Sequence, residues 1–412
     1  MASSDTFVIV GAGLAGAKAA EALRSQGFDG RLILLGAEHH TPYERPPLSK
    51  DYLTGKAPRE KVFVHAHRWY ADHDVELRSG QFVTDLDRAT RGVGLADGSV
   101  VSYDKLLLTT GASPRELGVP GADARGVHYL RTLDDSDVLR GTLATASRLV
   151  VIGAGWIGLE VTAAARLVGV EVTVVETAAL PLLRVLGPEV AQVFANLHRE
   201  HGVEFRFDAS LAEIVTDNGQ ATGVRLNDGT TIEADAVLVA VGATPNVQLG
   251  EAAGLRVDNG IVVDAALRTS DPNIFAAGDV ANAFHPMYNR HIRVEHWANA
   301  RQQPKAAATS MLGNDASYDE LPYFYTDQYD LGMEYVGFVE PDGYDQVVFR
   351  GDVARREFIA FWLSNNRVVA GMNVNVWDVV EPIKALIRSR VAIPAGRLAD
   401  RGAALMDLVQ PS

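Results

Sequence analysis

Two glycine-rich turns are the residues of this sequence whose types and spacing most clearly predict chemistry. The stretches FVIVGAGLAGAKAAEAL (7–23) and LVVIGAGWIGLEVTAAA (149–165) both contain the pattern G-x-G-x-x-G. In this pattern the first glycine permits a tight turn, the second lets the backbone approach a pyrophosphate, and the third lets a helix pack closely on a strand. Free N–H groups and the dipole at the start of that helix favour the bound anion. Two such turns predict two dinucleotide-binding sites.

The elements that must position these turns lie on either side of them. Each turn comes after a short apolar run, FVIV or LVVI, and precedes a run of small residues that reads as a helix. Strand, glycine turn and helix in this order begin a Rossmann-type unit. We therefore expect an α/β fold with two Rossmann-type dinucleotide-binding domains.

Each dinucleotide site is expected to carry a carboxylate that accepts hydrogen bonds from an adenosine ribose. In the second unit Glu176 stands at the expected spacing, after the run VEVTVV. Its charge would repel a 2′-phosphate, so the sequence predicts NADH rather than NADPH. In the first unit the matching position is Gly36, and the nearest carboxylate is Glu38. Glu38 is therefore the candidate ribose-binding carboxylate of the first dinucleotide site.

A stiff stretch with one lysine comes after the first of these units: PYERPPLSK, residues 42–50. Pro46 and Pro47 fix the backbone φ and so restrict the residues next to them in the chain. Arg45 can give a pyrophosphate a charged donor. Lys50 is either a rigidly held functional cation or one more surface charge on a rigid loop.

The composition excludes several classes of chemistry. The chain has no cysteine, which rules out disulfides, thiolate nucleophiles, cysteine-ligated zinc and protein-bound iron–sulfur clusters. Redox chemistry would need a bound organic cofactor or a metal held by other ligands. The pairs His39–His40 and His65/His67 lack a supporting set of carboxylates, so we read them as surface histidines and expect no metal site.

Charge and apolar runs bear on partners and location. Lys and Arg total 38 against 52 Asp and Glu, and the net charge of −14 argues against a nucleic-acid or anionic-membrane partner. No apolar run approaches the roughly 20 residues of a membrane helix. The N-terminal stretch MASSDTFVIV lacks a basic region and a cleavable apolar segment, so a cytoplasmic location is expected.

A second repeated pair indicates how the domains are nested. YDKLLLTTGASPR (103–115) and ADAVLVAVGATPN (234–246) share an Asp, an apolar strand, Gly-Ala and a Pro, and they bracket the second glycine turn. We expect the chain to leave one domain at the first copy and return at the second. After about residue 321, four or five antiparallel strands and the helical run WDVVEPIKALIRSR predict an α+β domain. The predicted domains are 1–110 with 242–320 for the first dinucleotide, 111–241 for the second, and 321–412.

Nearly the whole chain, about residues 6–405, resembles the FAD-dependent, NADH-linked ferredoxin reductases of bacterial oxygenase systems. The motifs that carry the resemblance are PYERPPLSK, VIGAGWIGLE, GATPN, IFAAGDVA, VEHWANA and DQYD. It implies a glutathione-reductase-like fold. It also implies electron flow from NADH through FAD to a 2Fe–2S or related ferredoxin, which serves a cytochrome P450 or a Rieske-type oxygenase. Tyr325 stands where the family usually has Trp, a departure at the partner-facing surface.

The resemblance also implies roles for single residues. Lys50 would lie beside flavin N5 and O4, paired with Glu160, and a cation there favours the reduced, anionic flavin. Glu160 would contact Lys50 or the nicotinamide, unless it is a solvated helix charge. Trp156 would cover the flavin until NADH displaces it, or would simply pack against its neighbours. Asp279 would bind the ribityl or pyrophosphate side of FAD. Trp297 would lie close to the flavin and the exit of electrons, unless it is a core residue.

The predicted catalytic residues are Lys50, Glu160 and Trp297. The residues assigned to FAD are Gly11, Gly13, Ala15, Gly16, Glu38, Arg45, Lys50, Val83, Thr110, Gly111, Arg131, Gly278, Asp279, His296 and Trp297. The residues assigned to NAD are Gly153, Gly155, Trp156, Ile157, Gly158, Glu160, Glu176, Arg184 and Gly242.

Two other functions on the same fold stay open. Disulfide reductases and NADH peroxidases of this fold use cysteines close to where PPLSK stands, and the absence of cysteine removes both. An NADH oxidase that needs no thiol remains, as does an NADH-responsive interaction protein resembling apoptosis-inducing factor. The lack of a long inserted loop in the C-terminal domain favours the reductase. We expect a monomer or a weak homodimer.

Overall fold

The computed structural model describes residues 4–409, and the chain divides into two compact units. The first unit consists of Met1–Arg45, Arg59–Ser113 and Ala243–Glu320. The second unit consists of Pro46–Pro58, Pro114–Gly242 and Leu321–Ser412. The stretch that ends in Lys50 is therefore split between the units, because its first four residues pack with the first and its last five with the second.

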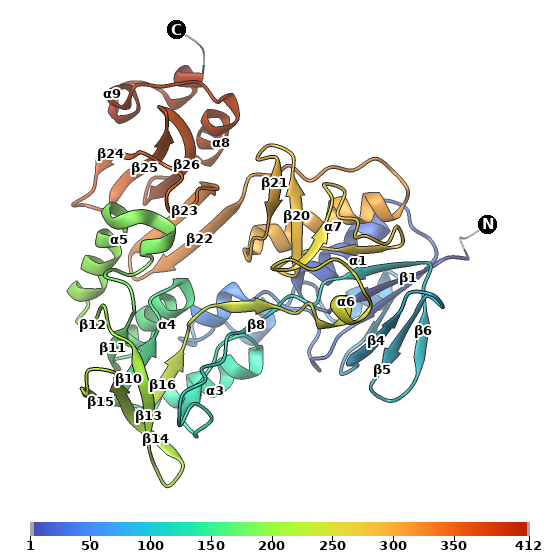
Figure 1. The fold of residues 1–412 in the computed structure, drawn as a ribbon, viewed down its shortest axis with the longest axis horizontal. Coiled ribbons are helices and arrows are strands. Elements are labelled where there is room, and N and C mark those ends of the chain that lie inside the picture. The colour runs from blue at the N-terminus through green and yellow to red at the C-terminus, as the bar shows by residue number, and fades with distance from the viewer. Residues whose placement is uncertain (1–3, 410–412) are drawn as a thin grey trace. The chain divides into compact units, whose positions relative to one another are not determined.

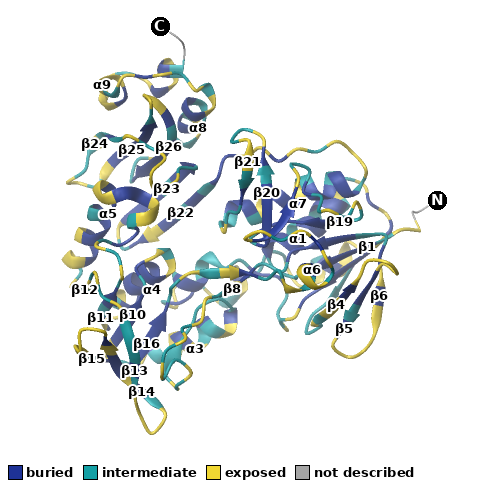
Figure 2. Ribbon diagram, in the orientation of Figure 1, coloured by how far each residue is buried: buried dark blue, intermediate teal, exposed yellow. Residues whose placement is uncertain are grey.

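The first unit is built on a parallel five-stranded sheet of order β19-β7-β1-β2-β3, of which β1 is labelled in Figure 1. Its strands are β1 (Thr6–Val10), β2 (Arg31–Leu35), β3 (Val75–Arg78), β7 (Lys105–Leu108) and β19 (Ile274–Ala276). The central strands are continuous apolar runs because a parallel sheet is buried on both faces, and they are dark blue in Figure 2. Helices α1 (Leu14–Ser25) and α7 (Trp297–Met311) pack against each other.

Smaller sheets complete the first unit. The antiparallel sheet β4-β5-β6 consists of β4 (Val83–Asp87), β5 (Gly92–Leu95) and β6 (Val100–Ser102). A mixed sheet contains β18 (Ile261–Val263), β20 (Ala281–His285) and β21 (Arg290–Ile292), in which β18 and β20 are parallel and β21 is antiparallel to β20. Two short strands pair where the chain leaves this unit and returns to it, β8 (Ala112–Pro114) and β17 (Ala243–Pro245). The short helices are α2 (Arg68–Asp72) and α6 (Gln248–Ala252).

The second unit contains another parallel five-stranded sheet, of order β12-β11-β10-β16-β9. Its strands are β9 (Val127–His128), β10 (Arg148–Ile152), β11 (Glu171–Val175), β12 (Glu204–Arg206) and β16 (Ala236–Val239). The helices are α3 (Leu133–Leu143), α4 (Trp156–Leu167) and α5 (Leu183–Glu200). A three-stranded antiparallel sheet adds β13 (Leu211–Asp217), β14 (Gln220–Leu226) and β15 (Thr231–Glu233).

The C-terminal part of the second unit is an antiparallel sheet of order β22-β23-β26-β25-β24 (Figure 1). Its strands are β22 (Tyr323–Gln328), β23 (Leu331–Gly337), β24 (Gln346–Asp352), β25 (Glu357–Ser364) and β26 (Arg367–Val374). Helices α8 (Val380–Ser389) and α9 (Ala395–Ala399) come next in the chain. Trp362, fully buried on β25, donates from its indole N–H to the Leu186 carbonyl of α5 at 3.2 Å. The parallel and antiparallel sheets of this unit thus share one core.

Between residues 4 and 409 no helix is both long enough and apolar enough to cross a membrane. In the same described range no three His, Asp or Glu side chains gather as a metal ion would require. His65 instead stacks on Trp69 with ring centres 4.0 Å apart and lies 3.1 Å from the Glu21 carboxylate. This histidine therefore packs within the first unit.

Candidate functional site

The glycine turn between β1 and α1 is closely packed at two of its glycines and open at the third. Gly11 has φ +114, and a Cβ there would lie 2.2 Å from the Thr109 carbonyl oxygen. A Cβ on Gly16 would lie 2.0 Å from the Gly11 oxygen. A Cβ on Gly13 would meet no atom within 4 Å, and within the described residues no side chain caps the helix that begins there. The open space and the uncapped N–H groups fit a pyrophosphate.

The turn between β10 and α4 repeats this geometry in the second unit. A Cβ on Gly153 would lie 2.4 Å from the Ala240 oxygen, and one on Gly158 would lie 2.2 Å from the Gly153 oxygen. Gly155, before the first residue of α4, again faces open space, and among the residues described no side chain caps this helix. Each unit therefore contains one cradle that a dinucleotide fits.

Glu176 lies just beyond the C-terminal end of β11, where backbone donors hold its carboxylate. One oxygen accepts the Ala154 N–H at 2.8 Å, and the other accepts the Ala178 N–H at 2.9 Å and the Thr177 hydroxyl at 3.0 Å. The carboxylate is thus fixed beside the glycine turn, as a ribose partner would need to be. Arg184 and Ile157 are exposed at the starts of α5 and α4.

We expect that replacing Glu176 by Gln relaxes the choice of coenzyme. The neutral amide removes the charge that would repel a 2′-phosphate, so activity with NADPH should rise relative to NADH by about tenfold, equivalent to about 1.4 kcal/mol. The ratio of kcat/KM values for the two coenzymes measures this. A wild-type chain that uses both equally would contradict the assignment of Glu176, and Glu171→Gln at the exposed start of β11 serves as the control.

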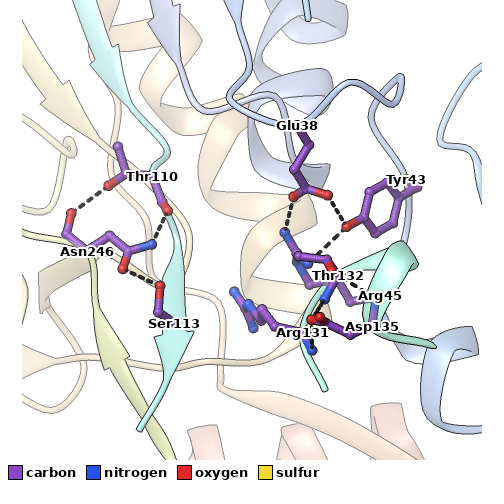
Figure 3. A network of polar contacts seen from close by, with 9 residues as sticks. All are labelled: Glu38, Tyr43, Arg45, Thr110, Ser113, Arg131, Thr132, Asp135 and Asn246. Carbon is purple, nitrogen blue, oxygen red and sulfur yellow. Dashed lines mark hydrogen bonds and ion pairs between the residues drawn. The ribbon is translucent and has the colours of Figure 1, made fainter. Parts of the chain in front are cut away.

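In the first unit Glu38, Tyr43 and Arg45 form a compact cluster (Figure 3). The Tyr43 hydroxyl donates to one Glu38 oxygen at 2.5 Å, and the Arg45 guanidinium lies 3.1 Å from the other. Burial alone would lower the pKa of Arg45, but the negative groups around it, including Glu38 and Asp279, raise that pKa above its usual value. Arg45 is therefore a fixed cation that can meet an anionic ligand.

Trp297 begins α7, and its indole N–H donates to the Glu44 carboxylate at 3.0 Å. The Arg301 guanidinium lies over the indole, 4.4 Å from the ring centre. Nearby, the Gly278 N–H donates to the buried Gln303 amide at 2.8 Å. Gln303 could not be predicted as a site residue from the sequence, because a lone amide within a helical run carries no signal of its own.

Thr110, Ser113 and Asn246 join the two strands that connect the units (Figure 3). The Asn246 amide donates to the Thr110 carbonyl, and the Thr110 hydroxyl donates to the Asn246 carbonyl, both at 2.8 Å. The Ser113 hydroxyl donates to the Asn246 amide oxygen at 2.8 Å. The Asn246 N–H also donates to the Gly111 carbonyl at 2.9 Å. The GASP and GATPN turns are therefore joined by several hydrogen bonds, and the Thr110 hydroxyl donates its proton in one of them rather than to a cofactor.

Lys50, which is largely shielded from water, and the buried Glu160 form an ion pair in the second unit. The Lys50 ammonium lies 2.8 Å from a Glu160 oxygen, and the two side chains are 14% and 5% exposed. Glu160 also accepts hydrogen bonds from the Ser49 hydroxyl and, at 2.7 Å, from the Thr326 hydroxyl. The Tyr325 ring centre lies 5.6 Å from the ammonium. The contacts of Ser49 and Thr326 with Glu160 could not be predicted from the sequence, because these two residues are 111 and 166 positions away from Glu160.

The stiff loop itself is anchored on two sides. Pro46–Ser49 forms a 3-10 turn, and the Ser136 hydroxyl of α3 donates to the Leu48 carbonyl at 2.9 Å. Ser49 is held by Glu160 of α4. The pair of prolines thus leads into a segment that is fixed to both helices, and Lys50 is presented from it.

Trp156 is half-buried against aromatic residues of its own unit. Its ring centre lies 4.9 Å from that of Phe324 on β22 and 5.7 Å from that of Phe194 on α5. These are the contacts of a packed residue. Its movement on binding of NADH stays a prediction.

The other predicted site residues are divided between the two units. The first unit contains Ala15, which is buried on α1, Val83 at the start of β4, Gly278, Asp279 and His296. The second unit contains Arg131, whose N–H donates to the Asp135 carboxylate at 3.0 Å (Figure 3), and Gly242, whose carbonyl accepts the Arg115 N–H at 2.9 Å.

Two histidines, the fully buried His198 and the partly buried His296, predict sensitivity to acid. Burial lowers the pKa of His198 and that of His296 to about 4, against about 6.5 in the unfolded chain. Between these values the unfolded chain binds more protons, so the free energy of unfolding falls as the pH falls from 6.5 towards 4. The expected slope is about 1.4 kcal/mol per pH unit for each histidine, and it vanishes above pH 6.5. Urea unfolding at several pH values measures it. The slope should be smaller in His198→Gln, and an unchanged slope would refute the assignment.

Comparisons with known proteins agree with this geometry. Residues 5–304 match the family described as pyridine nucleotide-disulphide oxidoreductases, and residues 323–409 match the family described as the reductase C-terminal domain. The chain is 39% identical to putidaredoxin reductase of Pseudomonas putida, over 99% of this chain and 98% of that protein. It is 42% identical to the ferredoxin–NAD(+) reductase component of the anthranilate 1,2-dioxygenase system of Burkholderia cepacia, over 97% and 98%.

Solved structures give the same result. The ferredoxin reductase for the CYP199A2 system from Rhodopseudomonas palustris superposes with a TM-score of 0.95 at 38% identity, over 98% of this chain and all of that one. The covalent putidaredoxin reductase–putidaredoxin complex also gives 0.95 at 38% identity, over 99% of this chain and 98% of the matched chain. The predicted family and the glutathione-reductase-like fold are confirmed. The chain belongs to the pyridine nucleotide-disulphide oxidoreductases, in the group of the putidaredoxin and dioxygenase ferredoxin reductases.

Proposed function

We propose that this chain is an FAD-containing reductase that oxidises NADH and passes the electrons to a small ferredoxin of the 2Fe–2S or a related type. That ferredoxin would serve a cytochrome P450 or a Rieske-type oxygenase. The observation that carries the proposal is the buried Lys50–Glu160 pair in a chain with two dinucleotide cradles and no cysteine. The names of the relatives support the same reaction.

The two cradles would each hold one cofactor, so that each unit binds a different one. FAD would be held in the first unit by the open turn at Gly13, by Arg45 and by the backbone around Asp279. NADH would be held in the second unit by the turn at Gly155 and by Glu176. Bound FAD supplies the chemistry that takes two electrons at once and releases them one at a time.

The side chains around Lys50 supply position and charge. The Lys50 side chain is only 14% exposed, so the field of its ammonium is screened by water less than that of a surface lysine. Glu160, Ser49 and the two prolines keep this charge in one place. In such a site the protein holds and orients the cofactor and tunes its electronics, and no thiol of this chain takes part because it has none.

The domain division that we propose has three parts: 1–110 with 242–320 for FAD, 111–241 for NAD, and the C-terminal domain 321–412. The separate sheets of the three parts support this. The segment Pro46–Pro58 packs with the second unit although the sequence places it within the first part. We also propose a cytoplasmic protein that is a monomer or a weak homodimer, which sedimentation over a range of concentrations would test.

The experiment that tests the function uses the purified flavoprotein and NADH. We expect rapid bleaching of the flavin, and then reduction of an added 2Fe–2S ferredoxin at least about tenfold faster than oxygen is consumed. Oxygen consumption at a rate similar to ferredoxin reduction would favour an NADH oxidase. Slow bleaching with dimerisation on NADH would favour an interaction protein, and purified protein without flavin would refute all three.

A further inference from the structure

Behind Glu160 a line of buried polar side chains leads away from Lys50. Thr326 and Gln328 are alternate residues of β22, so both point to the same face of the strand. His198 comes from α5. All three are at most 1% exposed. Polar groups so deeply buried require hydrogen-bond partners.

These side chains bond to one another in sequence. The Thr326 hydroxyl donates to Glu160 at 2.7 Å, and the Gln328 amide N–H donates to the Thr326 oxygen at 3.2 Å. A ring nitrogen of His198, Nε2, lies 2.8 Å from the Gln328 amide oxygen. The Tyr329 hydroxyl lies 3.2 Å from the other ring nitrogen, Nδ1. We call Tyr329, His198, Gln328 and Thr326 the donor chain.

The bond from the Thr326 hydroxyl to Glu160 sets the direction of every other bond in the donor chain, because a carboxylate can only accept. Because the Gln328 N–H is given to Thr326, its amide oxygen must accept, and His198 Nε2 must carry a proton. Burial lowers the pKa of His198 to about 4, so at neutral pH the ring has one N–H. Nδ1 is then an acceptor for the Tyr329 hydroxyl. All four donors point towards the Glu160 carboxylate, and bonds aligned in this way strengthen one another.

The donor chain also limits what else Glu160 can bind. A carboxylate offers about four lone-pair positions. Lys50, Thr326 and Ser49 use three of them. One position remains for a donor from a ligand, such as a carboxamide N–H of the nicotinamide.

We propose that the donor chain is a positioning device that holds Glu160 as an acceptor facing Lys50 and thereby sets the positive field that Lys50 exerts on the bound flavin. This inference rests on the proposed function. Thr326 and Lys50 share one carboxylate oxygen. Without the hydroxyl, that oxygen carries more negative charge and neutralises the ammonium more fully. The reduced, anionic flavin is then less stabilised.

The test compares three variants of the flavoprotein by the two-electron reduction potential of the flavin, measured against a reference dye. Thr326→Val should shift the flavin equilibrium towards the oxidised form by about tenfold, which is about 30 mV more negative for a two-electron couple. Thr326→Ser, which keeps the hydroxyl, should restore the wild-type potential. Thr162→Val is the matched control, because the buried Thr162 hydroxyl, on the same helix as Glu160, donates to the Gly158 carbonyl of its own helix at 2.7 Å.

The measured potentials distinguish a specific effect of the Thr326 hydroxyl on Glu160 from a general effect of replacing a buried threonine. A shift in Thr326→Val that Ser reverses and that Thr162→Val lacks supports the proposal. A wild-type potential in Thr326→Val overturns it, and so does an equal shift in both valine variants.

A second readout observes the wild-type protein and needs no activity. Nitrogen-15 NMR of the histidine rings, with His198→Gln used to assign the signal, should show His198 as the Nε2–H tautomer at pH 7. A proton on Nδ1 would reverse the donor chain and overturn the proposal. If the protein bound no flavin, the proposed function would fail in the absorption spectrum, whereas the tautomer would still test the donor chain.

Discussion

Replacing Lys50 by Met is expected to slow reduction of the flavin by NADH about 100-fold, a loss typical of a misplaced reacting group, while FAD stays bound. The Gly11–Gly16 turn and Arg45, which we assign to FAD, lie in the other unit, so this substitution leaves them unchanged. Stopped-flow absorbance at the flavin band measures the rate. A wild-type rate would refute the role of Lys50.

The same variant should also lose stability, because it leaves Glu160 buried without its cation. Removing one member of a buried pair costs about 3–5 kcal/mol, and the Ser49 and Thr326 hydroxyls that remain favour the lower end. The double variant Lys50→Met/Glu160→Gln removes both charges. It should recover most of the free energy of unfolding but not the rate, which distinguishes loss of chemistry from loss of structure.

Substitution of the middle glycine in each turn should impair the binding of one cofactor and leave the binding of the other unchanged. Gly155→Ala adds a methyl group where no atom lies within 4 Å and φ is −79, so the fold should accept it at a cost below about 1 kcal/mol. The methyl group occupies the space of the pyrophosphate, and we expect KM for NADH to rise at least about tenfold with FAD content unchanged.

Gly13→Ala makes the corresponding change in the first turn, where φ is −91 and the space is again open. We expect it to lower the FAD retained through purification, while the affinity for NAD+, measured by calorimetry, stays at the wild-type value. Gly141→Ala in α3 also adds a methyl group to open space and is the control. If Gly13→Ala and Gly155→Ala impaired the same cofactor, the division between the units would be wrong.

The fold was predictable because its strongest signals are local. Each glycine turn specifies its own strand and helix within about 17 residues, and the short apolar run in REFIAFWL, rich in aromatic and β-branched residues, indicates β25 without reference to the rest of the chain. The pairing of Lys50 with Glu160 was different. The two residues are 110 positions apart, and only the resemblance to a family linked them.

The polar core around that pair was not predictable from the sequence. Thr326 and Gln328 lie in YTDQYD among residues that alternate between exposed and buried, and His198 lies on an amphipathic helix where a polar residue usually faces solvent. Their burial depends on the packing of α5 against β22, and no local pattern encodes that contact. The same is true of Trp156, whose neighbours Phe194 and Phe324 come from two other elements.

The packing of Pro46–Pro58 with the second unit has a consequence for exchanging modules between related reductases. A chimera that takes residues 114–242 and 321–409 from a relative, but leaves 46–58 behind, would set a foreign loop against α3 and α4 and would mismatch Lys50 with its acceptor. A transplant that carries 46–58 as well keeps the ion pair, the Ser49 contact and the Ser136 anchor from one parent. The part of the chain that must be exchanged as one piece is therefore discontinuous. Recombination within this group should keep residues 46–58 together with 114–242 and 321–409 of the same parent.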